Sequence, residues 1–200
     1  MGSISSKGLV EGTIAGVLAF LLTFIPTTLG DYTIALAIIP IVFISLRRGM
    51  LQGLLTGILA GLLVFLIQDG SEDTVANIVV QFAPFAFIGI SGIYAKFTQR
   101  TLNNKRFPNA ALNIATASLF GALLYYLWHF IGHVTFNADI VPEGQSVFSY
   151  FMKIDGLSLL MTFGVTAVLL LLVAKLSPKL FVPKNTPFLS RKEKSRILND

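Results

Sequence analysis

The stretch "IPIVFISLRRGMLQGLLTGILAGLL", residues 39–63, decides the fold. In it two apolar runs flank a short basic turn, Arg47-Arg48-Gly49. A membrane-spanning helix needs about 20 mostly apolar residues, and the run after the turn is close to that length. The run before it is shorter and contains Pro40, which removes a backbone donor and bends a helix. The stretch therefore predicts two membrane helices joined as a tight hairpin.

The composition of the whole chain places it in a membrane. Of its 200 residues, 54% are hydrophobic and only 12% are charged, whereas a soluble domain carries about 25% charged residues. The absence of cysteine excludes disulfides, thiol catalysis and thiolate metal sites. The first apolar run follows a single basic residue, Lys7, and lacks a convincing small-residue cleavage site. We therefore expect a retained helix at this end rather than a signal peptide.

Apolar runs of suitable length recur along the chain, so we predict an all-α integral membrane protein with six transmembrane helices. The predicted spans are 8–26, 32–46, 50–68, 75–95, 109–134 and 156–176. An even number of spans puts both termini on the same side of the bilayer. We expect a single membrane domain at 1–183 and a basic, flexible tail at 184–200.

The charges assign a side to each loop. With these spans, all but one of the 15 basic residues fall on the side of the termini, Lys153 being the exception. Most of the acids fall on the other side: Asp31, Asp69, Glu72, Asp73, Asp139, Glu143 and Asp155. The positive-inside rule makes the basic side cytoplasmic, so we expect both termini in the cytoplasm. Because topology explains the basic residues, we expect no nucleic-acid binding.

Small residues follow one face of the first predicted span. Gly8, Gly12 and Gly16 recur every four residues, and Ala15 and Ala19 form a neighbouring stripe. Such spacing lets another helix approach closely. Two alternatives remain open, namely packing against helices of the same chain and docking of another membrane subunit. The same spacing recurs in the third predicted span, at Gly53, Gly57 and Gly61.

Polar aromatic residues gather at the outer end of the fifth predicted span. The stretch "YYLWHFIGHVTF", residues 125–136, holds both histidines of the chain, His129 and His133, and its single tryptophan, Trp128. On a helix Tyr125, His129 and His133 share one face, because they are four residues apart. The stretch leads into the polar segment 135–156, and loops of such length are usually functional or disordered.

Three explanations compete for the two histidines. Imidazoles tolerate the membrane interface, where tryptophan and tyrosine also gather. Histidines at i and i+4 can share a metal ion, but the chain has no HExxH motif and no cysteine. Alternatively they line a pocket for a small aromatic or cationic ligand, because aromatic faces attract cations and polar groups within spans are candidates for function.

Catalysis has little support in the sequence. No Ser/His/Asp or paired-carboxylate arrangement stands out, and no GxxxxGK[ST] phosphate loop is present. We therefore expect no enzyme, no cofactor and no metal in this chain, and no use of ATP by the chain itself. A helical membrane protein with an outward pocket and no motor suggests the binding subunit of a larger machine.

Several motifs, in their order and spacing, resemble the thiamine-specific S-component of energy-coupling factor (ECF) transporters. The resemblance covers residues 10–183 and rests on the opening stretch and on "AFIGISG", "YYLWHFIGHVTF", "VPEG", "YFMKIDG" and "SPKLFVPK". It implies an S-component-like bundle in the plasma membrane of a prokaryote, which captures thiamine from outside. Its partners would be the ECF coupling membrane subunit and two ATPase subunits, which use the ATP.

The resemblance also implies the roles of single residues. Its docking surface for the coupling subunit falls on the small residues of the first span: Gly12, Ala15, Gly16 and Ala19. A ligand-contacting histidine of the family matches His129, a pocket tyrosine matches Tyr150 and a pocket asparagine matches Asp155.

The chain departs from the family pattern at other pocket positions. An acid followed by tyrosine falls at Val80 and Gln81, a glycine at His133, and two tryptophans at Asn137 and Asp31. The predicted ligand site therefore comprises His129, Tyr150, Asp155, Gln81, His133, Asn137, Asp31 and Trp128. Thiamine is the leading ligand. The alternatives are another vitamin or precursor, such as hydroxymethylpyrimidine or pyridoxine, a non-transport membrane scaffold, and a metal-dependent membrane enzyme.

Overall fold

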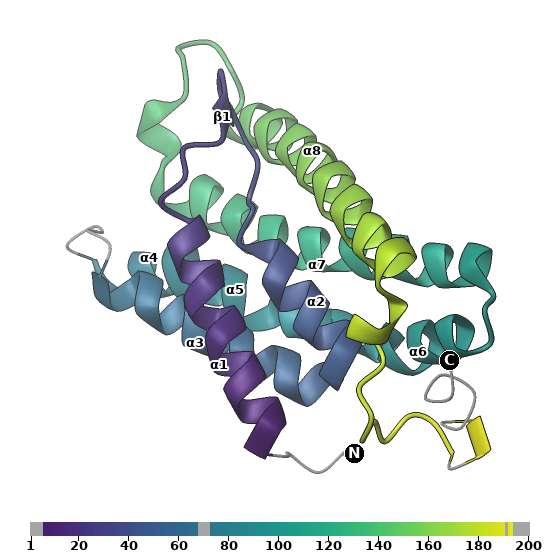
Figure 1. Cartoon of the computed structure of the whole chain (residues 1–200). Coiled ribbons are helices and arrows are strands. Elements are labelled where there is room, and N and C mark those ends of the chain that lie inside the picture. The colour runs from purple at the N-terminus through teal and green to yellow at the C-terminus, as the bar shows by residue number, and fades with distance from the viewer. Residues whose placement is uncertain (1–5, 68–72, 191, 194–200) are drawn as a thin grey trace.

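The computed structural model describes residues 6–67, 73–190 and 192–193, and its regular structure is mostly helical (Figure 1). The continuous helices are α1 (Ser6–Leu22), α2 (Ile38–Arg48), α3 (Met50–Ile67), α7 (Phe107–Phe136) and α8 (Val147–Leu176). One further segment, Thr74–Asn103, changes its winding along its length. It comprises α4 (Thr74–Asn77), the π-helix η1 (Ile78–Phe82), α5 (Ala83–Ile88), the 3-10 helix η2 (Gly89–Tyr94) and α6 (Ala95–Asn103). Within the described residues the predicted number of helical segments is confirmed.

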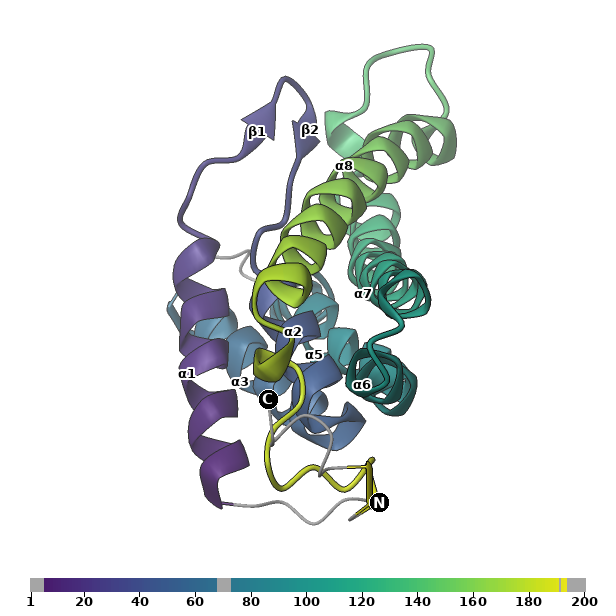
Figure 2. The ribbon, with the colours of Figure 1, turned by 45° about the vertical axis from the view of Figure 1, so that its right-hand side comes forward.

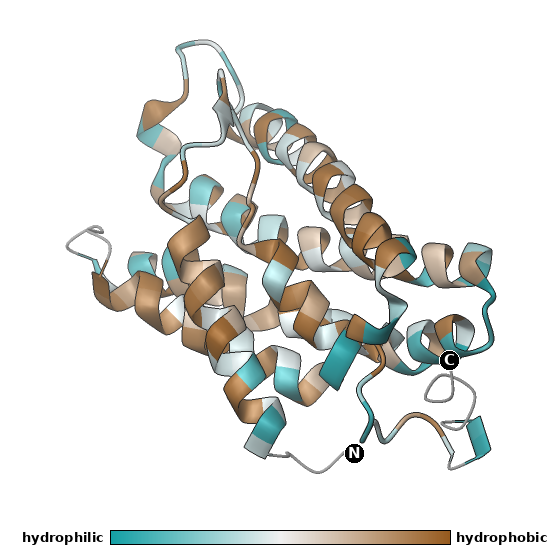
Figure 3. Cartoon of the chain, in the orientation of Figure 1, coloured by the Kyte–Doolittle hydropathy of each residue, from teal (hydrophilic) through white to brown (hydrophobic). Residues whose placement is uncertain are grey.

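The helices differ in whether they alone can cross a bilayer. Within the described residues, four segments are long and apolar enough: Met50–Ile67, Thr74–Asn103, Phe107–Phe136 and Val147–Leu176. The helix α1 has 17 residues and α2 only 11, so both fall short of the usual length. Exposed apolar residues lie along α1, α3 and α8, and the ribbon of Figure 3 shows the hydrophobic colour along much of these helices, as expected for helices that face lipid.

The predicted helix at 32–46 is wrong at its beginning. Its first residues instead form a hairpin of two short strands, β1 (Thr28–Leu29) and β2 (Tyr32–Thr33), paired antiparallel. Gly30 turns the chain with φ of 64°, a backbone conformation that glycine adopts without a steric penalty. Threonine and tyrosine favour the strands, and α2 begins only at Ile38.

The predicted connection at 135–156 is mostly helix. The helix α8 begins at Val147, so Tyr150 and Asp155 are helical residues. What remains between α7 and α8 is the segment 137–146, which contains the 3-10 turn η3 (Ala138–Ile140). The views in Figures 1 and 2 place this segment beside the β1–β2 hairpin, at one end of the molecule.

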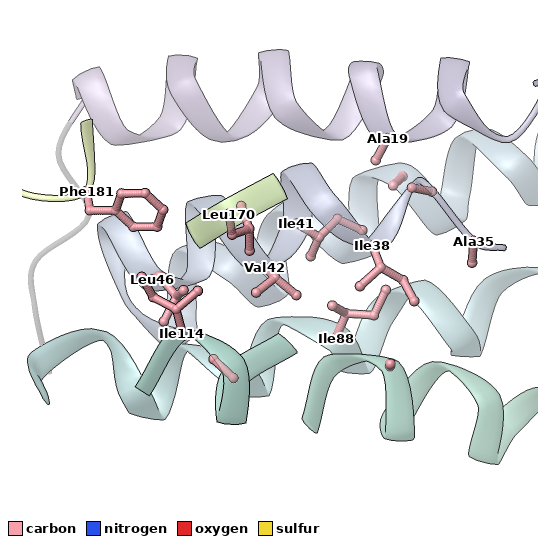
Figure 4. Packing of buried hydrophobic residues seen from close by; sticks show 14 of the residues in the cluster. Ala19, Ala35, Ile38, Ile41, Val42, Leu46, Ile88, Ile114, Leu170 and Phe181 are labelled. Atoms are coloured by element: carbon pink, nitrogen blue, oxygen red, sulfur yellow. The ribbon is translucent and has the colours of Figure 1, made fainter. Parts of the chain in front are cut away.

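The helix α2 occupies the centre of the bundle. Its residues Ile38, Ile41, Val42 and Leu46 are fully buried. Around them pack Ala19, Ile88, Ile114 and Leu170 of the surrounding helices and Phe181 of the segment that follows the last helix (Figure 4). A helix buried on all faces carries apolar residues all round, which explains why this short segment contains so few polar residues.

The small residues of α1 face inward. A side-chain carbon added at Gly12 would lie 2.5 Å from Gln52 Nε2, and one at Gly16 would lie 3.1 Å from the carbonyl oxygen of Thr56. Both neighbours belong to α3, and Ala15 and Ala19 are also buried. Packing within the chain, the first of the two alternatives, therefore describes this structure, and the predicted docking face is covered.

The segment after the last helix, where we predict a flexible tail from 184, is packed against the bundle in its described part. The turn η4 (Pro178–Leu180) follows α8, and Thr186 and Leu189 beyond it are buried. The Thr186 hydroxyl donates to Gln99 Oε1 at 2.6 Å. Gln99 Nε2 in turn donates to the carbonyl oxygens of Leu46 and Arg47, at 2.9 and 2.8 Å. Residues 191 and 194–200 of the predicted tail lie outside the described residues.

The arginines of the opening stretch fasten α2 to α1. Arg47 Nε donates to Glu11 Oε2 at 2.8 Å and Arg48 Nε to the same atom at 2.7 Å. Arg47 also donates to the carbonyl oxygen of Leu180 in η4.

Three acids were predicted in the loop after the third span. Of these, Asp73 caps α4 by accepting from the amide of Val75 at 2.8 Å. Asp69 and Glu72 lie outside the described residues.

Candidate functional site

Three adjoining cavities open near the hairpin end of the bundle. The α7–α8 cavity, of about 320 Å³, lies between those two helices and β2. The hairpin cavity, of about 410 Å³, lies between the segment 22–37, η1 and α7. The α4–α7 cavity, of about 330 Å³, lies beside the first turns of the segment 74–103. Thr33, Tyr125 and His129 line both of the first two cavities, so these cavities share a wall.

A row of aromatic rings lines the α7–α8 cavity. The ring centroids of Tyr125 and His129 lie 4.6 Å apart, and those of His129 and His133 lie 5.5 Å apart. The predicted helical face of these residues is therefore present. The row continues onto α8, where His133 stacks on Phe151 at 4.8 Å with 22° between the ring planes. Tyr150 meets Phe151 edge-on at 5.3 Å.

A hydrogen-bonded pair joins the two helices within this row. His133 Nδ1 lies 3.0 Å from Asp155 Oδ2, and only 5% of Asp155 is exposed. A carboxylate removed from water needs a partner, because an unpaired buried charge is costly. The histidine supplies that partner. The pair thus explains how an acid can lie inside an apolar helix.

Hydroxyl groups of α7 and α8 hold the strand β2 against this cavity. Tyr126 donates to the carbonyl oxygen of Thr33 at 2.6 Å. The amide of Thr33 donates to Ser158 Oγ at 3.0 Å, and the amide of Ala35 donates to Thr162 Oγ1 at 3.0 Å. Tyr126, Ser158 and Thr162 are not among the predicted site residues. Hydroxyl residues four apart on an apolar helix, as at Ser158 and Thr162, are the signal that could have revealed them.

The predicted site residues divide among the cavities. Asp31, His133, Tyr150 and Asp155 line the α7–α8 cavity, with Asp31 on the hairpin turn. His129 lines both this cavity and the hairpin cavity. The structure therefore brings five of the predicted residues to one place.

Two other predicted residues line the hairpin cavity and the α4–α7 cavity. Gln81 lines the hairpin cavity and the α4–α7 cavity, and Asn137 lines the latter. Gln81 belongs to the π-helix η1, a rare winding that is frequent at functional sites. This wider turn changes the direction in which the following side chains leave the helix.

Trp128 lies apart from the other predicted site residues. This residue lines none of the three cavities. Its ring stacks on Phe87 of α5, with the centroids 5.2 Å apart and 17° between the planes. Trp128 thus packs α7 against α5 rather than forming part of the cavity wall.

The chemistry of the cavity walls suits a planar organic ligand. The rings can stack on a flat heterocycle, and the histidines, hydroxyls and carboxylates can orient its polar substituents. Among the described residues no group of three or more histidine, cysteine or acidic side chains could hold a metal ion.

Comparisons with known proteins agree with this architecture. Residues 9–182 match a family model described as "Thiamine transporter protein". The chain is 27% identical over 190 residues to the thiamine transporter ThiT of Lacticaseibacillus paracasei, which covers 92% of this chain and 94% of that one. It is 29% identical over 149 residues to ThiT of Bacillus subtilis, covering 74% and 78%. The solved structure of ThiT from Listeria monocytogenes superposes with a TM-score of 0.83, at 29% identity, over 88% of this chain and 98% of that one.

Proposed function

The chain belongs to the thiamine transporter protein family, and on that premise we propose that it is the substrate-capture subunit of an ECF-type importer, which binds thiamine from outside the cell. Its homologues and its fold are those of a transporter subunit rather than an enzyme. It is a multi-pass membrane protein, and the relatives that it matches are bacterial proteins.

The α7–α8 cavity is the observation that carries the proposal. It combines stacking rings, from Tyr125 to Phe151, with a buried carboxylate and two histidines. Thiamine has two flat heterocycles, one of which is cationic, so it offers faces for stacking and a charge that carboxylates attract. Asp31 and Asp155 supply the carboxylates of this cavity.

The energy for transport would come from partner subunits. The chain has no phosphate-binding loop, so we propose that it works with the ECF coupling subunit and two ATPases. Because Gly12, Ala15, Gly16 and Ala19 are buried, the part of α1 available to a partner in this conformation is its apolar outer face. That face carries Val10, Ile14, Leu18 and Leu21. We propose that the termini are cytoplasmic, because the basic residues lie on their side.

Calorimetric titration of the purified, full-length protein in nanodiscs tests the ligand. We expect saturable binding of one thiamine per chain, and at least a tenfold weaker affinity for Tyr150→Ala, because a polar group placed against the ligand is typically worth about 1–3 kcal/mol. Asp139→Asn is the control, because Asp139 is exposed on η3 and lines none of the three cavities. Absence of saturable thiamine binding would contradict the proposal.

A related ligand is the second candidate, and specific residues favour it. Val80, Gln81 and Asn137 line the α4–α7 cavity, at positions where the family pattern has an acid, a tyrosine and a tryptophan. Competition of hydroxymethylpyrimidine and pyridoxine against thiamine ranks the three compounds. A lower dissociation constant for either competitor than for thiamine would identify that compound as the ligand that the chain captures.

A further inference from the structure

We propose that His133 and Asp155 act together as a hydrogen-bond acceptor that selects a planar heteroaromatic ligand carrying an amino group. The inference rests on the proposed function and names the ligand chemistry that the α7–α8 cavity prefers. It concerns a pair of residues, one from each of the two helices that enclose this cavity.

With Asp155 ionised and His133 neutral, the hydrogen bond places the ring hydrogen on Nδ1. An ionised carboxylate only accepts, so Asp155 Oδ2 accepts from His133 Nδ1–H across the 3.0 Å contact. In a neutral imidazole the other nitrogen, Nε2, then has a lone pair and no hydrogen. His133 therefore offers an acceptor as its remaining polar atom.

Packing holds the imidazole in this orientation. His133 lies on Phe151 at 4.8 Å, and Phe151 is itself only 2% exposed. The ring is thus fixed by a stack on one face and by a hydrogen bond at one edge. A polar group whose position is fixed before binding discriminates strongly, because it cannot turn to suit a mismatched ligand.

Asp155 adds a second acceptor to the same wall. Its Oδ2 atom is used by His133, and a carboxylate has a further oxygen with lone pairs of its own. Both residues line the α7–α8 cavity. A ligand amino group has two hydrogens to donate, so it matches a wall that offers two acceptors.

An oxo group in place of the amino group would meet the wrong partner. Its oxygen only accepts, so it would face the two acceptors of the wall with no hydrogen between them, because the hydrogen of the lactam form lies on a ring nitrogen instead. Sites that bond a particular polar group reject analogues lacking it, because buried polar atoms are then unpaired. The ratio of the affinities for the amino and the oxo compound therefore measures how strongly His133 and Asp155 select the amino group.

Thiamine and its 4-oxo analogue provide the test, because they differ at this substituent of the pyrimidine ring. Calorimetry on the full-length protein in nanodiscs gives both affinities. For the unaltered protein we expect thiamine to bind about 100-fold more tightly than the 4-oxo analogue. Equal affinities, or a preference for the analogue, would overturn the inference while leaving thiamine binding itself intact.

The variant Asp155→Asn assigns the preference to the pair. Its amide can turn N–H toward His133 Nδ1, which would move the ring hydrogen to Nε2 and convert that atom into a donor. We expect the ratio of the two affinities to fall by about tenfold or more. Asp139→Asn, which removes an exposed acid, should keep the ratio of the unaltered protein. An unchanged ratio in Asp155→Asn would overturn the inference.

The result also separates the inference from the proposed function. If neither compound binds the unaltered protein, thiamine capture is contradicted and the inference falls with it. If thiamine binds but the analogue binds as well, only the inference falls. The thermal midpoint of each variant shows whether it is folded, and the comparison of two ligands on the unaltered protein needs no variant.

Discussion

The hydroxyl of Tyr126 in α7 donates a hydrogen bond of 2.6 Å to the carbonyl oxygen of Thr33 in the strand β2. The same hydroxyl lies 3.0 Å from Thr162 Oγ1 of α8, and only 4% of Tyr126 is exposed. One phenol thus connects two helices with the hairpin that borders the α7–α8 cavity. The hairpin is short, and the side chains of Tyr126 and Ser158 bond its strand β2 to the two helices. Its position therefore depends on such contacts.

Removing this hydroxyl should loosen the hairpin. For Tyr126→Phe we expect a loss of about 1 kcal/mol in the free energy of unfolding, the usual contribution of one hydrogen bond. We also expect thiamine to dissociate faster, with little change in its association rate, because the cavity wall is less firmly held. Thermal unfolding and stopped-flow displacement measure the two effects. Tyr94→Phe, whose ring packs edge-on to Phe120 away from the hairpin, should change neither.

Two threonines of α8 make a matched comparison. Thr162 accepts from the amide of Ala35, so Thr162→Val leaves a buried amide unpaired and should cost about 1–3 kcal/mol of unfolding free energy. The hydroxyl of Thr166 is buried and has no hydrogen-bond partner among the described residues. Thr166→Val should therefore be neutral or stabilising. Equal losses for the two variants would show that volume rather than hydrogen bonding determines stability here.

Much of the fold could be predicted because apolar runs long enough for a helix are unmistakable. The hairpin could not, because strands of two residues, Thr28–Leu29 and Tyr32–Thr33, are too short to show a period. The beginning of α8 was placed too late because Lys153 and Asp155 made the segment look like a loop. Asp155 is tolerated in the helix by a contact with His133, and a contact between distant residues is not visible in the sequence.

Only part of the candidate site could be predicted from the sequence. The shared face of Tyr125, His129 and His133 follows from helical spacing. Trp128 immediately precedes His129 and therefore leaves the helix about 100° away from it, toward α5 rather than the cavity. The placement of Gln81 depends on the π-helix η1, whose wider turn is not encoded in any simple pattern. The stripe of Gly12 and Gly16 shows that a helix can approach closely, but not which helix.

The packed segment after residue 183 should contribute to stability. Truncation after Pro183 would remove Thr186, the hydrogen-bond partner of the buried Gln99, together with the buried Leu189. We expect a clear decrease in the thermal midpoint, because the side-chain oxygen of Gln99 loses its hydrogen-bond donor and apolar surface becomes exposed. Truncation after Glu193 keeps these contacts and is the control. A protein ending at 183 that melts like the full chain would restore the view of a flexible tail.

The outer face of α1 should govern assembly with partner subunits. Ile14 is 63% exposed, so Ile14→Trp adds bulk to this face without touching the packed interior. We expect unchanged thiamine binding and thermal stability but reduced co-purification with the coupling subunit. Gly16→Leu should behave differently, because even its first side-chain carbon would lie 3.0 Å from Leu59 of α3. That variant should lower the thermal midpoint, as overpacking typically costs about 1–3 kcal/mol.

The smaller change Gly16→Ala separates docking from folding on this helix. It adds a single methyl group on the inward stripe, so a folded protein is expected, with a modest decrease in the thermal midpoint and normal assembly. If instead Ile14→Trp assembles normally while folded Gly16→Ala does not, the small-residue stripe is the docking face. The helix α1 would then have to move away from α3 when the partner binds, because Gly12 and Gly16 pack against α3 in this structure. Co-purification of the two variants with the coupling and ATPase subunits, each at matched expression, decides between the two faces.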